Sequence, residues 1–205
     1  QMEAELKKLD IEYVLKDITD LSQSCLDGAT RTKEIVQGLR TFSRMEATTV
    51  RKADLIEAIR STVKLLITNY RDRIQVHEEF ESIPLVECNL SQIQQVLMNL
   101  ISNACQAISG KGDIWLRTWE EQGQVYIEIE DSGSGMPREV AEKVFDPFYT
   151  TKEVGEGTGL GLSIAYGLIQ KHQGSIEVHS EPGVGSLFTL RIPTIQSDTE
   201  VSHRK

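Results

Sequence analysis

Residues 131–136 read D-S-G-S-G-M and residues 155–162 read G-E-G-T-G-L-G-L, two glycine clusters on either side of F-D-P-F-Y-T-T-K at 145–152. Glycine suits positions where the backbone approaches a ligand closely or takes a positive φ. Two such clusters predict two chain segments that close on one anion. With N-L-I-S-N-A at 99–104, on an expected helix, they predict a pocket for adenine, a metal ion and phosphates.

The composition of the 205-residue chain indicates a globular protein, with 39% hydrophobic and 26% charged residues. The chain has no run of about 18 apolar residues and no signal-peptide pattern. We therefore expect no membrane contact by the chain and a cytoplasmic location, with membrane anchoring of a longer parent protein left open. The net charge of −9 argues against a nucleic-acid surface, which needs clustered Lys and Arg.

Residues 1–46 are expected to form one long helix, because they include no proline and their apolar residues return at alternating steps of three and four. This is the rhythm of a coiled coil or helical bundle. A lone helix cannot bury such a stripe, so we expect a homodimer through this helix, the alternative being packing on its own domain. The stripe consists of Ile11, Val14, Ile18, Leu21, Cys25, Gly28, Thr32, Ile35, Leu39 and Phe42.

The chain divides into a helical region at 1–49, a domain at 50–193 and a flexible polar tail at 194–205. The middle region predicts an α+β fold, a two-layer α/β sandwich in which helices cover one face of a mixed sheet of about five strands. The expected helices run from an Asp54 cap to about Asn69, from Asn89 or Ser91, near 137–143, and at 160–172. The expected strands lie at 74–80, from Pro84, and at 114–119, 125–130, 176–180 and 187–192.

Asp131 ends an expected strand beside flexible glycines, where its carboxylate can accept a hydrogen bond from the exocyclic amino group of a base. Adenine carries that donor, whereas guanine carries a carbonyl that would repel the carboxylate and leave a buried charge unpaired. The residue therefore indicates selection of ATP over GTP. The alternative is an ordinary D-x-G turn, since Asp and Gly are common in loops.

Asn99 and Asn103 lie four residues apart on one face of an expected helix, with Gln106 alongside. Amide oxygens are hard, neutral ligands suited to a Mg²⁺ ion that keeps most of its waters and bridges nucleotide phosphates. Asparagine is a mediocre helix former, so two on one face of an apolar helix require a reason. Hydrogen bonding of these amides to a neighbouring loop is the alternative.

Gly155, Gly157, Gly159 and Gly161 precede an expected helix, whose N-terminus and backbone N–H groups can hold phosphates. No frame fits G-x-G-x-x-G or G-x-x-x-x-G-K-[ST], so neither a dinucleotide-binding fold nor a P-loop is supported. A merely flexible loop is the alternative. Lys152 offers a mobile positive charge for a terminal phosphate, or is a solvated lysine.

These segments, in this order, resemble the N, first-glycine, F and second-glycine boxes of sensor histidine kinases in the GHKL ATP-binding superfamily. The likeness covers about residues 53–193, and T-T-K and G-T-G-L-G-L are similar to the nitrogen-regulation type. It implies a Bergerat ATP-binding fold with ATP and Mg²⁺ under a mobile lid at about 136–157. E-I-V-Q-G-L-R-T-F-S-R at 34–44 resembles the second helix of these kinases' dimerisation and phosphotransfer hairpin.

The resemblance also implies roles at matching positions. Asn103 is the implied Mg²⁺ ligand, with Asn99 as a further candidate, and Asp131 meets adenine. Phe145 and Phe148 anchor the lid. The implied ATP-binding residues are Asn99, Asn103, Gln106, Asp131, Gly133, Gly135, Met136, Phe145, Phe148, Thr151, Lys152, Gly155, Gly157, Thr158, Gly159, Leu160 and Gly161.

The chain departs from the resemblance in two respects. Gln106 stands where many relatives carry a lysine, so phosphate charge must be neutralised elsewhere, with Lys152 as our candidate. No histidine is followed by an acidic residue and then proline, so the phospho-acceptor is expected outside this chain. The four histidines are expected to be structural or exposed, and the three cysteines to be reduced, buried and apolar in role: His77, His172, His179, His203, Cys25, Cys88 and Cys105.

The expected function is that of the ATP-binding catalytic region of a two-component sensor histidine kinase, an ATP-dependent phosphotransferase of signal transduction. Asn99 stands where ATP-hydrolysing relatives carry a glutamate, and an amide cannot take a proton from water at neutral pH. We therefore expect transfer of the γ-phosphoryl to a histidine, and then to an aspartate of a response-regulator receiver domain. The alternatives are a non-catalytic, nucleotide-gated dimerisation module and a GHKL serine/threonine kinase.

Overall fold

The computed structural model describes residues 13–26, 28–29, 50–152 and 157–195. The chain forms two units, residues 1–44 with 150–158 and residues 45–149 with 159–205. In the first unit, residues 13–26 and 28–29 are helical, in agreement with the heptad pattern. The other positions of the helix predicted at 1–46 lie outside the described residues. No helix in the described ranges is both long and apolar enough to cross a membrane.

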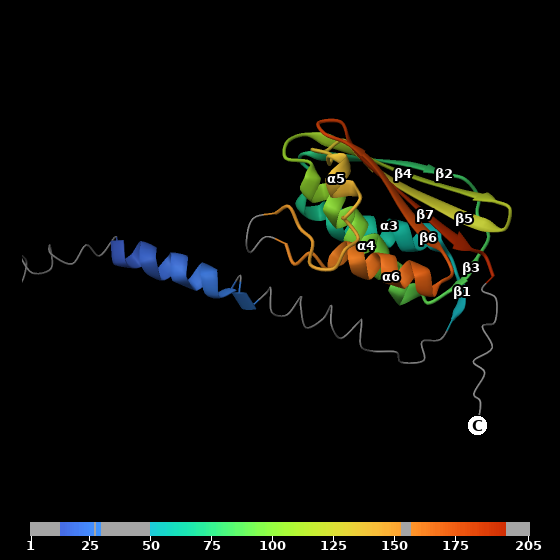
Figure 1. Ribbon diagram of the computed structural model, residues 1–205, viewed down its shortest axis with the longest axis horizontal. Coiled ribbons are helices and arrows are strands. Elements are labelled where there is room, and N and C mark those ends of the chain that lie inside the picture. The colour runs from blue at the N-terminus through green and yellow to red at the C-terminus, as the bar shows by residue number, and fades with distance from the viewer. Residues whose placement is uncertain (1–12, 27, 30–49, 153–156, 196–205) are drawn as a thin grey trace, which may run out of the picture. The chain divides into compact units, whose positions relative to one another are not determined.

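The second unit is built on a mixed sheet of five strands, as the sequence predicts (Figure 1). In order across the sheet these strands are β2 (Ile74–Phe80), β4 (Gly112–Glu121), β5 (Gln124–Asp131), β7 (Gly185–Pro193) and β6 (Ser175–Glu181). β2 runs parallel to β4, and every other neighbouring pair is antiparallel. β5 is therefore the central strand, and Asp131 lies at its end.

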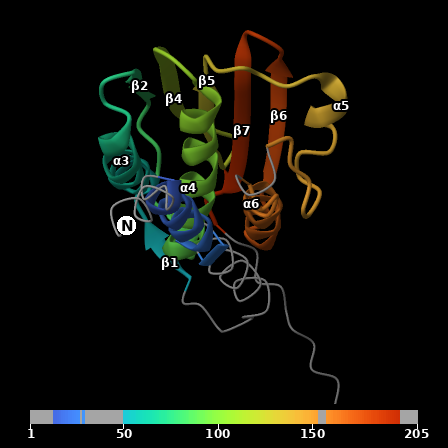
Figure 2. The ribbon, with the colours of Figure 1, turned by 90° about the vertical axis from the view of Figure 1, so that its left-hand side faces the viewer.

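Three helices cover one face of this sheet (Figure 2): α3 (Leu55–Leu66), α4 (Leu90–Ala107) and α6 (Gly161–Lys171). Asp54 caps α3 by accepting a hydrogen bond from the Glu57 N–H at 3.1 Å, and η1 (Ile67–Asn69) continues the helix to its predicted end. Asn89 caps α4 through its side-chain oxygen. A short helix, α5 (Arg138–Ala141), lies within the predicted segment at 137–143.

The core lies between the sheet and these helices. Successive side chains of a strand point to opposite faces, so alternate residues of β4 and β5 turn toward the helices. Ile114, Leu116, Ile127 and Ile129 are accordingly buried. Helix α4 lies over the centre of the sheet and buries one long stripe, which consists of Ile93, Val96, Leu97, Leu100, Ile101, Ala104 and Cys105.

A two-stranded sheet was not predicted from the sequence. β1 (Arg51–Ala53) pairs antiparallel with β3 (Val86–Cys88). Three residues are too few to show the alternation that marks a strand, so β1 had no signal of its own. The strand expected from Pro84 begins two residues later, at Val86, where pairing with β1 starts.

Thr194 corrects the predicted start of the flexible tail. Its N–H donates to the Gly123 carbonyl, and its own carbonyl accepts from the Glu87 N–H, both at 3.0 Å. Thr194 is therefore fixed to the body of the domain, since backbone groups that can pair next to a sheet do so. Residues 196–205 lie outside the described part.

The cysteines follow the prediction in two positions of three. Cys88 and Cys105 are buried free thiols, and burial raises the pKa of Cys88 to about 11. Cys25 is exposed, so its predicted burial is wrong for the chain as described. Cys25 lies on a helix whose apolar residues Ile18 and Leu21 are exposed as well, so no described residue of its unit covers this stripe.

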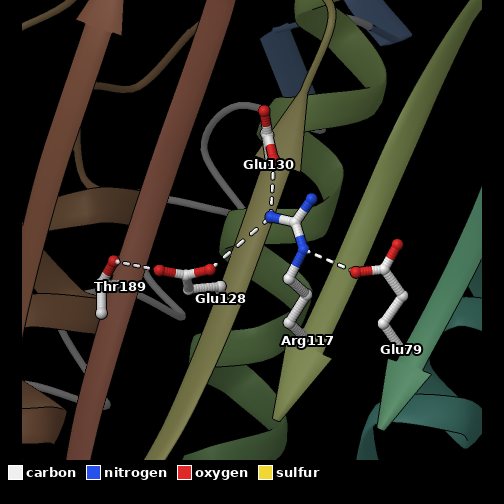
Figure 3. A network of polar contacts seen from close by, with 5 residues as sticks. All are labelled: Glu79, Arg117, Glu128, Glu130 and Thr189. Atoms are coloured by element: carbon white, nitrogen blue, oxygen red, sulfur yellow. Dashed lines mark hydrogen bonds and ion pairs between the residues drawn. The ribbon is translucent and has the colours of Figure 1, made fainter.

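The opposite face of the sheet carries a network of charges around Arg117 (Figure 3). Its guanidinium pairs with Glu79 at 2.8 Å, Glu130 at 2.6 Å and Glu128 at 3.6 Å. Hydrogen bonds to the carboxylates of Glu130 and Glu79 raise the pKa of Arg117, so it stays charged. Because the pairs are partly exposed, solvent screens them and each contributes at most about 1 kcal/mol. The fold therefore depends chiefly on the apolar face.

We predict that Leu100→Ala lowers the free energy of unfolding by about 3 kcal/mol, because it leaves a cavity where α4 meets the sheet. Leu65→Ala on α3 is the matched control, since Leu65 is 65% exposed whereas Leu100 is fully buried. The control should change stability by less than about 0.5 kcal/mol. Urea unfolding measures both, and equal losses would contradict the assignment of α4 to the core.

Candidate functional site

Asp131 is buried at the end of β5, 4% exposed. Its Oδ1 accepts a hydrogen bond from the Gly133 N–H at 2.8 Å, and the Ser186 N–H donates to the same carboxylate. The D-x-G turn that the sequence offered as an alternative is therefore present. The Asp131 carboxylate can still accept further hydrogen bonds, since a carboxylate has about four lone-pair sites and these contacts use two.

Burial is the largest influence on the acidity of Asp131. It raises the pKa of the carboxyl above its ordinary 3.8, while the hydrogen bonds from Gly133 and Ser186 lower the pKa and Glu130 raises it. A buried group whose charged form is disfavoured weakens the fold at neutral pH. Such a group in a glycine-rich loop is typical of a binding or catalytic position.

The first glycine cluster lies between the end of α4 and the β6–β7 turn. A Cβ on Gly133 would come within 2.7 Å of the Ala107 carbonyl oxygen, which accepts a hydrogen bond from the Ser134 N–H at 3.0 Å. Gly135 has a φ of +61°, and a Cβ there would lie 1.9 Å from the Glu181 carbonyl oxygen. Only glycine fits either position without rebuilding the loop.

The β6–β7 turn is a part of the site that the sequence did not assign. The Gly183 N–H donates to the Ser134 carbonyl at 2.8 Å, and the Met136 N–H donates to Ser180 Oγ at 2.7 Å. The sequence marked E-P-G-V-G at 181–185 only as a turn between strands. The glycines in this turn could have suggested that another backbone segment approaches closely, but they could not have identified that segment as the first glycine cluster.

The amide side chains of α4 have different partners. Asn99 Nδ2 donates to the Gly161 carbonyl at 2.7 Å, so the loop contact offered as an alternative is present for this residue. Gln106 Nε2 donates to Ser102 Oγ at 3.4 Å. Asn103 is half-buried, and no hydrogen bond of its side chain occurs within the described part of the chain. Its oxygen is therefore the amide acceptor best suited to a ligand.

The second glycine cluster leads into α6. Gly159 has a φ of +64°, and a Cβ there would lie 2.4 Å from the Phe148 carbonyl carbon. Leu160 precedes the helix and provides no side-chain cap, so the first-turn N–H groups of α6 have no side-chain acceptor from the capping position. Since Asn99 holds the Gly161 carbonyl, the structure brings the amide helix and the last glycine of this cluster together.

The two phenylalanines between the glycine clusters differ. The Phe145 ring packs against Tyr166 and Phe188, with ring centroids 5.4 Å and 6.5 Å away. The Phe148 side chain is 66% exposed, and its backbone has a φ of +66°. The Phe148 N–H donates to the Gly159 carbonyl at 2.9 Å. Phe145 is thus held by its ring and Phe148 by its backbone, a difference the sequence did not predict.

The remaining predicted site residues are not part of this unit. Thr151, Lys152, Gly157 and Thr158 belong to the first unit, where the Lys152 N–H donates to Thr150 Oγ1 at 3.2 Å. Gly155 lies outside the described residues. Roles for these five residues remain predictions.

The histidines of the described ranges hold structural or surface positions. His77 pairs with Asp113 at 2.7 Å and stacks on Trp115, on the sheet face opposite the helices. His172 is buried at the end of α6, and His179 is exposed on β6. His203 lies outside the described part.

Comparison with known proteins gives one family. Residues 88–196 match the family described as histidine kinase-, DNA gyrase B-, and HSP90-like ATPase. The signal transduction histidine-protein kinase AtoS of Escherichia coli (strain K12) is 34% identical over 89% of this chain and 28% of its own length. The sensor kinase CckA of Brucella abortus (strain 2308) is 35% identical over 87% of this chain and 20% of its own. The chain thus spans less than a third of these two relatives.

Solved structures give the same grouping. The catalytic domain of histidine kinase ThkA is 34% identical, has a TM-score of 0.64, and covers 71% of this chain and 95% of its own. ThkA in complex with the response regulator protein TrrA is 29% identical, with a TM-score of 0.72 over 91% of this chain and 53% of that one.

We predict that Asp131→Asn gains stability relative to the wild type as pH rises. The raised pKa means that the native state holds a proton that the unfolded state has released, between the ordinary value of 3.8 and the native value. The wild type therefore loses stability as pH increases through that window, and the amide does not. Urea unfolding between pH 3.8 and about pH 7 measures the difference. Asp146→Asn, at an exposed carboxylate, is the control, and the same trend in both variants would contradict the burial argument.

We also predict that Phe148→Gly is more stable than Phe148→Ala by about 1 kcal/mol. Both variants lack the ring, so they differ chiefly in how well they tolerate the left-handed backbone at φ +66°. Urea unfolding of the two ligand-free variants provides the comparison. An alanine variant as stable as the glycine variant would show that this backbone conformation is not maintained in solution.

Proposed function

Because the chain belongs to the histidine kinase-, DNA gyrase B- and HSP90-like ATPase family, we propose that it is the ATP-binding catalytic region of a two-component sensor histidine kinase. The observation that carries this proposal is the buried carboxylate of Asp131. The backbone N–H groups of Gly133 and Ser186 hold it, and it can accept further hydrogen bonds. That position matches a purine amino group. Asp131 accepts from the adenine amino group, and the carbonyl of guanine is excluded because it would face a buried negative charge.

The phosphates of ATP lie at the other end of the site. The first turn of α6 presents backbone N–H groups at the positive end of the helix dipole, directly after the second glycine cluster. Leu160 provides no side-chain cap for this turn. Lys152 is our candidate for neutralising the terminal phosphate.

A magnesium ion fits the amide helix. Asn103 is half-buried with no side-chain partner among the described residues, and its oxygen is a hard neutral ligand. Asn103 would hold the ion together with phosphate and water oxygens, which are ligands that Mg²⁺ prefers. When bound, Mg²⁺ neutralises phosphate charge and orients the γ-phosphoryl group. Asn99 supports the site differently, by holding the Gly161 carbonyl.

Phosphoryl transfer is favoured over hydrolysis. Hydrolysis needs a general base that takes a proton from the attacking water. Asn99 on α4 carries an amide, which cannot accept that proton. A histidine nitrogen outside this chain attacks the γ-phosphorus, the bond to the β–γ bridging oxygen breaks, and ADP leaves while the imidazole releases its proton to solvent. A neutral imidazole is already a nucleophile, so the domain supplies alignment and charge stabilisation.

The partners follow from the same proposal. The exposed apolar residues Val14, Ile18 and Leu21 of the first unit are suited to helix–helix contact and support a homodimer through this helix. The phosphoryl group then passes to an aspartate of a response-regulator receiver domain, which the complex of ThkA with TrrA supports. ATP as the substrate places the chain in the cytoplasm, with anchoring of a longer parent protein left open.

We predict that the chain with γ-labelled ATP, Mg²⁺ and a separate histidine-bearing hairpin produces acid-labile label on the hairpin. Asp131→Asn should weaken ATP binding about tenfold or more, since a hydrogen bond to a charged acceptor is worth about 1.5–3 kcal/mol. Arg117→Met, on the far face of the sheet, is the control for binding. Calorimetry and acid treatment of the product supply the measurements.

Three results would count against this proposal. No uptake of ATP by folded protein excludes the site itself. Uptake without label on the hairpin favours the non-catalytic module, and acid-stable label favours a serine or threonine kinase.

A further inference from the structure

His172 joins two helices at their ends. It follows α6 directly and is 3% exposed. Its Nε2 accepts a hydrogen bond from the backbone N–H of Asn89 at 3.1 Å, and its Nδ1 contacts the Leu168 carbonyl at 2.8 Å. Asn89 is the N-cap of α4, so the end of α6 is tied to the start of α4.

Both contacts require a neutral imidazole in one tautomer. An amide N–H can only donate, so Nε2 must carry the lone pair, and a carbonyl can only accept, so Nδ1 must carry the proton. Burial lowers the pKa of His172, the hydrogen bond to Leu168 raises it, and the charge of Lys171 lowers it. Buried polar groups of this kind are fully paired or costly, and this one is fully paired.

A second tie joins the same helices at their other ends. Asn99 Nδ2 donates to the carbonyl of Gly161, the first residue of α6. The two helices pack against each other and run in opposite directions, since α4 meets the end of α6 at Asn89 and its start at Asn99. The ties lie about 15 Å apart along α4, at about 1.5 Å per residue. Two ties at this distance fix sliding and rotation, which one tie cannot do.

We propose that His172 is a positioning residue for the phosphate side of the nucleotide site, because it sets the register of α6 against α4. This inference depends on the function proposed above. The glycines at 159 and 161 are carried by the start of α6, and Asn103 by α4, so the register of the two helices sets the distance between the phosphate donors and the metal ligand.

The adenine side does not depend on this register in the same way. Asp131 belongs to β5, and its glycine segment is fixed by the β6–β7 turn through Ser134 and Met136. A shift of α6 would therefore move the phosphate donors and leave the base pocket in place. A displacement of about 1 Å in such a site costs up to about a hundredfold in rate.

The test compares ATP with adenosine, which has the base and no phosphates. His172→Phe keeps a ring of similar size and removes both hydrogen bonds, so we expect ATP with Mg²⁺ to bind at least about tenfold more weakly and adenosine to bind within about twofold of the wild type. His172→Gln, whose amide both accepts and donates, should restore most of the ATP affinity. Calorimetry measures ATP, and NMR titration measures the weaker adenosine.

Ile74→Ala is the matched control for lost stability. Ile74 is buried on β2, at the opposite edge of the sheet from β6, and its truncation costs about 2–5 kcal/mol without touching α6. It should leave the ratio of ATP to adenosine affinity unchanged. A register effect also predicts that Asn99→Ala and His172→Phe are not additive for ATP affinity, because either loss frees the same movement.

The outcomes separate this inference from the function on which it depends. A wild type that binds neither ligand overturns the proposed function. A wild type that binds both, with a His172→Phe variant that loses neither or loses both equally, overturns the positioning role alone. Should His172→Phe not fold, His172→Leu, which also removes both hydrogen bonds, provides the same comparison, and a loss restricted to ATP supports the inference.

Discussion

The burial of α4 over the centre of the sheet is the constraint on which the site depends. Its inner stripe is almost wholly removed from water, so the helix cannot move without exposing the core. Three contacts then join this helix to the segments that carry the proposed site. Asn99 reaches the start of α6, the Ala107 carbonyl receives the first glycine segment, and Asn89 receives the end of α6. The buried contact of α4 with the sheet thus fixes the helix to which these segments are hydrogen-bonded.

The same architecture holds two features that are unfavourable in the ligand-free fold. Asp131 is a carboxylate whose burial opposes its charge, and Phe148 holds a left-handed backbone that costs about 1–2 kcal/mol. Neither improves the stability of the ligand-free fold. Both lie beside the glycine clusters, and such groups persist where the surrounding structure over-determines them. At both positions the surrounding contacts therefore maintain a local state that lowers the stability of the fold.

The sequence predicted most of the fold because the main elements carry local signals. Asp54 and Asn89 cap their helices, and the alternation in β4 and β5 identifies the buried face. The sequence could not find β1 or the attachment of Thr194, because their partners are distant in the chain. It also could not find the burial of His172, since a lone histidine after a helix has no pattern. Cys25 was mispredicted because burial of the heptad stripe needs a cover that the described residues of its unit do not supply.

For the glycines of the candidate site, the sequence suggested why glycine is needed but not which groups each glycine contacts. The glycines at 133, 135 and 159 are required by close backbone contacts, which is the reason the sequence suggested. Their partners are the Ala107 carbonyl, the β6–β7 turn and Phe148, and none of these is readable from the glycines alone. In the proposed site, the base side is attached to β5, to the β6–β7 turn and to the Ala107 carbonyl at the end of α4, whereas the phosphate side is attached to the α4–α6 pair. Because different contacts hold the two sides, we expect a change in the contacts between α4 and α6 to affect the phosphate side more than the base side.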